Sequence, residues 1–340
     1  MSDLAYLYGE PDVTCFFKQF FADFQVTEIL PFTPCGEGEH LWIELEKTGE
    51  NTMWAAEQLA RCLKVSPRQV SFAGLKDRQG ITRQWFSIQY PISSQPDLTR
   101  LPETLKVLQC HRNLRKLRRG ALSGNHFTMK LRHVNNIESL THRIDSIKKG
   151  VPNYFGPQRF GHDGSNLQKA EQMFAGKRIK NRDKRSLYIS AARSFVFNQL
   201  VSARIRSGLA HQILSGDCMI LSGSHSYFIA HEVDDELRQR LAQRDIRLSG
   251  PLVGAGKLPS EDEAYQFEMK QLEENSHWLI GLERVGLKQE RRPLLVVPEE
   301  LSWQIEGDSV NLSFYLPAGS YATSVIRELA CFSSVYQGDA

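Results

Sequence analysis

The chain has 340 residues, 41% of them hydrophobic and 24% charged, with a formal net charge of +3. This length predicts about two domains, the apolar fraction is typical of a globular protein with a sizeable core, and so small a net charge does not by itself indicate a nucleic-acid partner. The opening segment MSDLAYLYGEPD has neither a basic nor an apolar signal region, and no apolar run approaches ~18 residues, so we expect no secretory leader and no membrane span.

The first half of the chain alternates between strand and helix patterns. A helix is expected from Asn51 to the Ser66-Pro67 stop, with apolar residues at helical spacing. A second helix is expected after 133, where four apolar residues share one face. Period-2 alternation or short apolar runs predict strands at 24–30, 41–46, 69–73, 83–90 and 127–133.

The character of the chain changes near Gly150. Residues 151–164 are rich in glycine, proline and aromatics, and the pattern from about 185 to 290 is mostly helical, with loops expected at 208–226 and 249–260. Strand alternation returns after 298 and reaches Pro317, and a last helix is expected at about 320–332. We therefore predict an α+β fold, with a mixed or antiparallel sheet flanked by helices and interrupted by a mainly helical insertion.

Positive charge is concentrated in two runs. No acidic residue occurs between Thr104 and Ile137, and the segment GKRIKNRDKR at 176–185 has six basic residues against one acidic residue. Segregated charge of this kind favours a basic face for a polyanion, although a solvated surface would explain each run equally well.

The loop SFAGLKDRQGITRQWFS at 71–87 contains one acidic residue, Asp77, between two predicted strands. Lys76, Arg78 and Arg83 surround it in the sequence, and nearby positive charge keeps a carboxylate ionised. An ionised carboxylate can act as a nucleophile or base, and the adjacent cations could bind phosphate. A surface turn with a salt bridge is the alternative for this loop taken alone.

The sequence lacks the motifs of several other functional classes, including phosphate-binding loops, metalloenzymes and serine hydrolases. GPLVGAGKL at 250–258 lacks the first glycine and the final Ser or Thr of a phosphate-binding loop. There is no GxGxxG, HExxH or GxSxG, and the histidines have no metal-ligand spacing, so we expect no metal site. The six cysteines are scattered without CxxC pairs, which predicts reduced thiols rather than a disulfide framework.

Four further segments complement the Asp77 loop. They are KQFFADFQVTE (18–28), GALSGNHFTMKLR (120–132), NYFGPQRFG (153–161) and LPAGSYATSVIRE (316–328). In the second, Asn125 could read a base edge while Phe127 stacks on the base, a combination suited to an unstacked RNA base. For Phe24, Phe127 and Tyr321, each taken singly, a place in an aromatic core is favoured over a binding role.

Together these segments, with SAARSFVFNQL at 190–200, resemble the TruD family of tRNA pseudouridine synthases in order and separation along almost the whole chain. The resemblance implies that Asp77 is the catalytic nucleophile. It implies that Phe24, Asn125, Phe127 and Tyr321 line a uridine pocket and that Lys18 lies near the carboxylate. Tyr321 stands where Phe also occurs in the family.

The resemblance also implies an architecture and a cellular context. A pseudouridine synthase catalytic domain in permuted order would comprise 1–149 and 298–340, and an inserted TRUD domain would comprise 150–297. The substrate would be tRNA, at uridine 13 of the D arm, for example in glutamate tRNA. The enzyme would be cytoplasmic and bacterial, with no cofactor, no metal and no required protein partner, and we expect a monomer. A non-catalytic RNA-binding or RNA-chaperone protein on the same fold is the main alternative, and a metal-free nuclease is a second.

Overall fold

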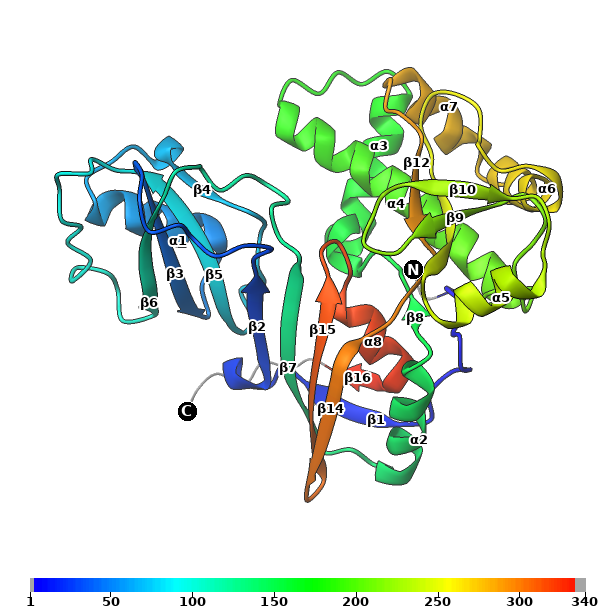
Figure 1. Ribbon diagram of the computed structural model, residues 1–340, viewed down its shortest axis with the longest axis horizontal. Helices are drawn as coiled ribbons and strands as arrows, with labels where there is room; N and C mark the ends of the chain where they lie inside the picture. Colours follow the sequence, from blue (N-terminus) through cyan, green and yellow to red (C-terminus); the bar gives the residue numbers. More distant parts are fainter. Residues whose placement is uncertain (1–2, 334–340) are drawn as a thin grey trace. The chain divides into compact units, whose positions relative to one another are not determined.

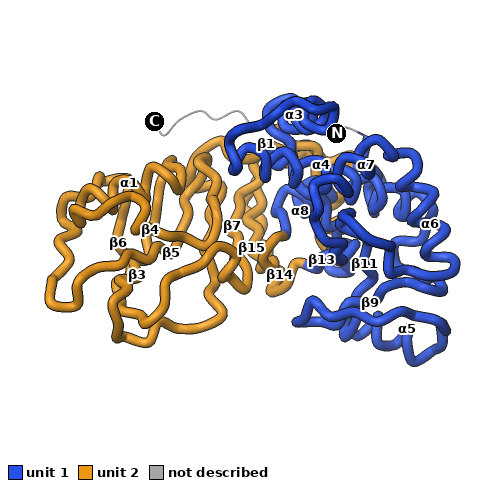
Figure 2. The backbone as a smooth tube through the Cα atoms, turned by 90° about the horizontal axis from the view of Figure 1, so that it is seen from above, with its two compact units in different colours: residues 1–10, 145–297, 320–328 blue, residues 11–144, 298–319, 329–340 orange. Residues whose placement is uncertain are grey.

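The computed structural model describes residues 3–333. The chain divides into two compact units, each assembled from separated segments (Figure 2). Unit 1 consists of the described residues up to Glu10, then Asp145–Val297 and Ser320–Glu328. Unit 2 consists of Pro11–Ile144, Pro298–Gly319 and the described residues from Leu329 onward. Each unit is described separately below.

Unit 2 is built on a ten-stranded sheet whose main path runs β14-β15-β7-β2-β5-β3-β6, with β1, β4 and β16 pairing off that path (Figure 1). The β2–β5 and β1–β16 pairs are parallel and the other pairs are antiparallel. The predicted α+β class with a mixed sheet is confirmed. The strands are β1 Thr14–Phe17, β2 Phe24–Ile29, β3 His40–Thr48, β4 Val70–Phe72, β5 Ile81–Gln89, β6 Leu105–Asn113, β7 Gly124–Arg132, β14 Glu299–Glu306, β15 Ser309–Pro317 and β16 Cys331–Ser333.

Helix α1 (Thr52–Cys62) packs on one face of the part of this sheet formed by β3, β4, β5 and β6 (Figure 1). The side chain of Asn51 accepts a hydrogen bond from Trp54 N, so it is the predicted N-cap, and Ala55 and Leu59 are buried against β3 and β5. The helix ends earlier than the predicted Ser66-Pro67 stop. Burial of its apolar face fixes the position of α1 on the sheet. The first turn of the helix is thereby placed where Thr52 can contact the loop between β4 and β5.

The remaining strands of unit 2 were not all predicted. β1 and β16 are short, and β6 lies inside the first basic run, where its exposed polar residues mask the alternation. The predicted strands at 24–30, 41–46, 69–73, 83–90 and 127–133 correspond to β2, β3, β4, β5 and β7. The helix predicted after 133 is α2 (Ile137–Ile147), and the last predicted helix is α8 (Ala322–Leu329).

Unit 1 combines helices with a four-stranded sheet in the order β10-β9-β11-β12 and a two-stranded pair of β13 and β8. Its helices include α3 Ser165–Phe174, α4 Arg182–Arg206, α5 Asp235–Ala242, α6 Asp262–Glu273 and α7 Ser276–Arg284. Its strands are β8 Val151–Pro152, β9 Asp217–Leu221, β10 Tyr227–Ala230, β11 Ile246–Leu252, β12 Glu290–Pro293 and β13 Leu295–Val296. The expected loops at 208–226 and 249–260 were therefore partly wrong, because short apolar runs such as CMIL have too few residues to reveal a period.

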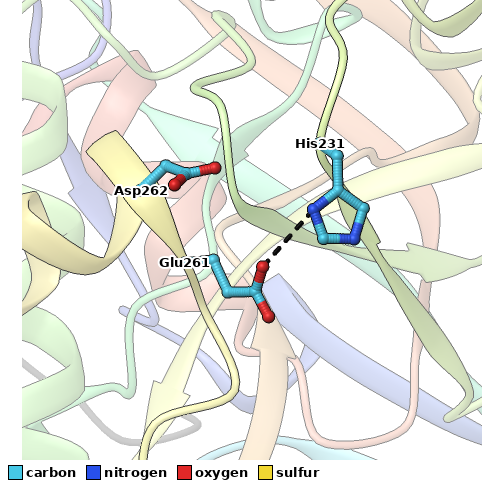
Figure 3. Close-up of side chains that lie close together, drawn as sticks. All are labelled: His231, Glu261 and Asp262. Carbon is cyan, nitrogen blue, oxygen red and sulfur yellow. Dashed lines mark ion pairs between the residues drawn. The ribbon is translucent and has the colours of Figure 1, made fainter.

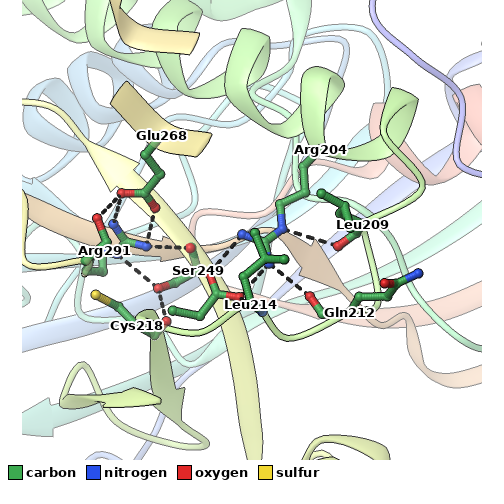
Figure 4. Close-up of polar contacts among 10 residues, drawn as sticks. Arg204, Leu209, Gln212, Leu214, Cys218, Ser249, Glu268 and Arg291 are labelled. Carbon is green, nitrogen blue, oxygen red and sulfur yellow. Dashed lines mark hydrogen bonds and ion pairs between the residues drawn. The ribbon is translucent and has the colours of Figure 1, made fainter. Parts of the chain in front are cut away.

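Two buried ion pairs cross the core of unit 1 (Figure 4). Arg204 of α4 pairs with Asp217 at 2.5 Å, and Arg291 of β12 pairs with Glu268 of α6 at 2.7 Å. Both pairs are almost completely buried, so losing one partner would leave an uncompensated charge. They tie helices α4 and α6 to the neighbouring strands.

All six cysteines lie within the described residues, and each is a free thiol there. Within residues 3–333, no helix is both long and apolar enough to cross a membrane.

Candidate active site

The loop that carries Asp77 joins β4 to β5, and its first arm is held by buried polar groups. Thr52, at the start of α1, accepts a hydrogen bond from Lys76 N at 2.9 Å and donates one to Gln84 at 3.0 Å. The Gln84 amide in turn donates to Gly74 O at 2.6 Å. Because Thr52 and Gln84 are fully buried, these bonds fix the first arm of the loop.

The second arm is fixed by a backbone contact at Gly80. Gly49 N donates to Gly80 O at 3.1 Å, and Arg78 Nε donates to Gly49 O at 3.1 Å. A β-carbon at Gly80 would lie 2.4 Å from Phe24 O, so only glycine fits between this loop and β2. The loop therefore meets β2 directly at one of the predicted pocket residues.

Asp77 is contacted by Lys18, from the segment that follows β1. Lys18 Nζ lies 2.5 Å from Asp77 Oδ2, and the two side chains are 11% and 19% exposed. The same ammonium lies 3.9 Å from the centroid of the Phe24 ring, and Gln79 N donates to Asp77 Oδ1 at 3.2 Å. The arrangement gives a partly exposed carboxylate a cation and an aromatic wall.

The cations adjacent to Asp77 in the sequence have other partners. Lys76 forms a 2.6 Å ion pair with buried Glu28, and Arg83 forms one of 2.8 Å with Glu46. Lys76 and Arg83 thus pair with glutamates, which corrects the expectation that they hold the Asp77 carboxylate. Lys18, which is distant in the sequence, does form an ion pair with it.

Phe24, Asn125 and Phe127 share one face of the sheet. In the β2–β7 register, Phe24 is opposite Met129 and Glu28 is opposite Asn125, so alternate residues of both strands point the same way. The Phe24 and Phe127 rings lie 6.2 Å apart, and both side chains are only 6% exposed. Phe127 also packs 5.6 Å from Phe314 of β15. The buried Asn125 Oδ1 has no hydrogen-bond partner among the described residues, so it is an acceptor in need of a donor.

Tyr321 belongs to unit 1, immediately before α8. Its hydroxyl accepts hydrogen bonds from Arg159 Nη2 at 2.6 Å and Nε at 3.2 Å, and its ring packs edge-on to Phe155 at 5.8 Å. Lys18, Phe24, Asp77, Asn125 and Phe127 are thus gathered within unit 2, while Tyr321 is packed within unit 1.

Sequence reasoning missed the buried polar residues beneath the loop. Lys47 of β3 is fully buried and donates to Thr82 Oγ1 at 2.6 Å and Glu50 O at 3.2 Å. Burial, with a contribution from the Lys76 charge, lowers the pKa of Lys47 to about 8. A signal was present in the sequence, because Lys47 occupies an inward position of an alternating strand.

Within the first basic run, residues 114–123 form a loop between β6 and β7 that is anchored to the sheet. The Leu117 side chain is 1% exposed and packs with Trp42 and Trp85, and Leu117 N donates to Ser87 Oγ at 2.9 Å. Gly120 N donates to Ala73 O at 2.8 Å, at the start of the Asp77 loop. The cationic side chains on either side of Leu117 are exposed; they are Arg115, Lys116, Arg118 and Arg119.

One exposed group in unit 1 has side chains of the types that bind metals (Figure 3). In the part of the chain that the structure describes, His231, Glu261 and Asp262 each offer a ligand atom, all within 4.8 Å of one another. His231 Nδ1 lies 3.3 Å from Glu261 Oε2, and Asp262 accepts a hydrogen bond from Ser215 at 3.1 Å. The two carboxylates sit at the start of α6, where the helix dipole already stabilises negative charge, so their proximity needs no cation.

Comparison with known proteins gives a consistent match. The family model for tRNA pseudouridine synthase D (TruD) matches residues 2–179 and 166–329. A tRNA pseudouridine synthase D from Aeromonas hydrophila is 51% identical over 97% of this chain and 94% of its own length. Its counterpart from Shewanella oneidensis is 47% identical over 98% of this chain and 91% of its own length.

A solved structure has the same fold. The crystal structure of a protein from Methanosarcina mazei, described as a tRNA pseudouridine synthase D candidate, aligns with a TM-score of 0.70 at 21% identity, over 96% of this chain and 95% of its own. At 21% identity, this structural similarity is evidence for the fold and not for the function. With the family model and the close relatives, it leads to one conclusion: the chain belongs to the tRNA pseudouridine synthase D family of RNA-modifying isomerases.

Proposed function

We propose that the protein converts a uridine of tRNA to pseudouridine, with Asp77 as the nucleophile and the target base held in an aromatic pocket. The target by resemblance is uridine 13 in the D arm, for example of glutamate tRNA. The observation that carries this proposal is the Lys18–Asp77 pair, 2.5 Å apart, beside the Phe24 ring. A carboxylate that is 19% exposed, cation-paired and bordered by aromatics has both access to a substrate and a defined orientation.

The reaction makes few demands on the protein. The N1–C1′ bond of the uridine breaks, the freed uracil turns, and a C5–C1′ bond forms. C5 then loses its proton while N1 gains one, so nothing is oxidised and no atom is added. Asp77 could attack C1′ or C6, or remove the C2′ proton to give a glycal, and each route needs the ionised carboxylate.

The pocket residues suit a base that must rotate. An aromatic face such as that of Phe127 imposes little in-plane direction on a stacked ring. Asn125 Oδ1, buried and without a partner among residues 3–333, could accept a hydrogen bond from a uracil N–H. The uridine must first leave its stack, which costs a few kcal/mol, and binding of phosphates by the basic runs would offset that cost.

The experiment that tests the proposal measures tritium release from tRNA labelled at C5 of uridine. Wild type should release close to one equivalent per tRNA, Asp77→Asn should release none, and Glu306→Gln should match wild type. Glu306 is the matched control, because it also pairs with a lysine, Lys130 at 2.7 Å, in unit 2. Equal release by wild type and Asp77→Asn would remove Asp77 from the chemistry. If wild type released tritium from none of the tRNAs tested, a non-catalytic RNA-binding function would explain the structure better.

We further infer a division of labour along the chain. Residues 1–149 and 298–340 would form the catalytic domain, and 150–297 the inserted TRUD domain that adds to the RNA-binding surface. Ser320–Glu328 packs with unit 1, so the inserted domain would also hold the segment that carries Tyr321 in position. The enzyme would work in the cytoplasm as a monomer, with no cofactor and no protein partner.

A further inference from the structure

The side chain of Arg159, in the NYFGPQRFG segment, donates its hydrogen bonds to neutral oxygens. Two go to the Tyr321 hydroxyl, and Nη1 donates to Ser190 Oγ at 3.1 Å. Among residues 3–333, Arg159 forms no ion pair with a carboxylate, and the Tyr321 hydroxyl has no acceptor for its own proton. The Arg159 guanidinium therefore has only neutral partners within these residues, and the Tyr321 O–H remains available to an acceptor outside the protein.

A second guanidinium lies on the same aromatic ring. Arg292 of β12 lies 4.1 Å from the Phe155 centroid, and Arg159 lies 5.5 Å from it. Arg292 also donates to Asn153 Oδ1 at 2.6 Å. Burial, together with the nearby Arg159 charge, lowers the pKa of Arg292 to about 10. The fold thus gathers two guanidinium groups at one aromatic ring.

The Phe155 ring, which both guanidinium groups approach, is rigidly placed. Phe155 N and O are both bonded to the side chain of buried Asn198, at 2.9 and 3.0 Å. Next to it, a β-carbon at Gly156 would lie 2.8 Å from Thr323 Oγ1 and 3.0 Å from the Tyr321 ring. Thr323 Oγ1 is itself buried and has no hydrogen-bond partner among the described residues. These polar groups are thus set in place before any ligand arrives.

We propose that Arg159, Arg292 and the Tyr321 hydroxyl form an anion subsite that takes one phosphodiester group of the substrate RNA. Arg159 Nη1 and Nη2 each carry a second N–H that could donate to the oxygens of a phosphate, and the tyrosine supplies a further donor. A phosphodiester fits better than a protein carboxylate because the substrate of the family is a polyanion. This inference rests on the proposed function only in taking tRNA as the ligand.

The test measures binding of an unmodified glutamate tRNA transcript across a range of salt concentrations. All variants carry Asp77→Asn, so that binding is measured without turnover. Arg159→Ala should weaken binding about tenfold and reduce the slope of log affinity against log salt by about 0.7 to 0.9, the value expected when one phosphate is no longer neutralised. Arg159→Gln, which keeps a donor to Tyr321 but no charge, should do the same. Tyr321→Phe should weaken binding a few-fold and leave the slope unchanged, because it removes a neutral donor.

The matched control is Arg240→Ala. Arg240 also lies over an aromatic ring, Phe228 at 5.5 Å, but it is paired with Asp245 at 2.7 Å. Both affinity and slope should stay at the parent values. Parent-like slopes in folded Arg159→Gln would overturn the subsite and leave the proposed function standing, even where affinity falls. If the tRNA affinity of the parent protein does not change with salt concentration, RNA is not the ligand, and the proposed subsite is wrong as well.

Discussion

Lys18 and Asp77 lie 59 residues apart in the sequence, yet their charged atoms are 2.5 Å apart. The pairing depends on an unusual backbone, because Lys18 has a φ of 61°, in the left-handed region that non-glycine residues rarely adopt. Tertiary contacts must hold that conformation, and it turns the side chain towards the loop. Non-glycine residues in such conformations cluster at functional sites.

Lys18→Met should therefore lower kcat more than it raises KM. A charge-assisted hydrogen bond contributes about 1.5–3 kcal/mol, so we expect a loss of roughly 10- to 150-fold in rate. Single-turnover kinetics with saturating enzyme would measure it. Lys130→Met, which breaks the comparable Lys130–Glu306 pair, is the control and should keep the wild-type rate. An unchanged rate in Lys18→Met would mean that the pair is only structural.

Gly80→Ala should displace the Asp77 loop. The new methyl group would lie 2.4 Å from Phe24 O, and neither backbone can yield cheaply. We expect the unfolding free energy to fall by about 1–3 kcal/mol, with a larger loss of activity than the loss of stability explains. Gly74→Ala, in the same loop, meets no atom within 4 Å and should behave like wild type. Urea unfolding and tritium release on both variants would test this, and similar behaviour of the two would contradict it.

Lys47 should make stability depend on pH in the alkaline range. Burial lowers its pKa in the folded protein from 10.5 to about 8, so the folded state releases this proton first. Between those two values the unfolded state binds more protons, and the unfolding free energy therefore rises with pH. The contribution of Lys47 to that rise has an upper limit of about 3 kcal/mol.

Lys47→Met removes this effect and provides the comparison. Urea unfolding at intervals from pH 7 to 10.5 should show wild type gaining stability relative to Lys47→Met as pH rises above 8. Parallel curves for the two proteins would mean that Lys47 keeps an ordinary pKa.

In the loop at 115–119, we expect the four exposed cations to contribute to tRNA binding and the buried Leu117 to contribute to stability. Replacing Arg115, Lys116, Arg118 and Arg119 by Ala should leave the unfolding free energy unchanged, since all four side chains are exposed. It should weaken tRNA binding and reduce its salt slope by about 0.7–0.9 for each phosphate that the loop neutralises. Leu117→Ala should do the reverse, costing about 2–5 kcal/mol of stability because that side chain is 1% exposed. If the quadruple variant unfolds, these four residues are needed for stability, and the RNA-binding role assigned to them is wrong.

Local patterns predicted the elements whose causes are local. The α1 N-cap is a bond between Asn51 and Trp54, three residues apart, and the alternation in β2 and β7 reflects burial on one face. Both signals can be read within a short window of sequence. The same holds for the Asp77 loop, which is bounded by two strands and marked by its glycines.

Distant pairings could not be predicted in the same way. β1 pairs with β16, so Thr14 lies beside Cys331, and no window of sequence contains both. The Lys18–Asp77 contact has the same origin. Charge proximity in the sequence was misleading at Lys76 and Arg83, because adjacent residues of a tight loop point in different directions and Glu28 and Glu46 compete for them.

Both units require both ends of the chain. In unit 1, buried Glu328 accepts hydrogen bonds from Leu7 N and Tyr8 N at 3.0 and 3.3 Å, and Arg327 donates to Ala5 O at 3.0 Å. In unit 2, β1 completes its parallel pair only when β16 is present. A ribosome synthesises these partners more than three hundred residues apart. Neither unit can therefore complete these contacts until the segment from Arg327 to Ser333 has been synthesised and has left the exit tunnel.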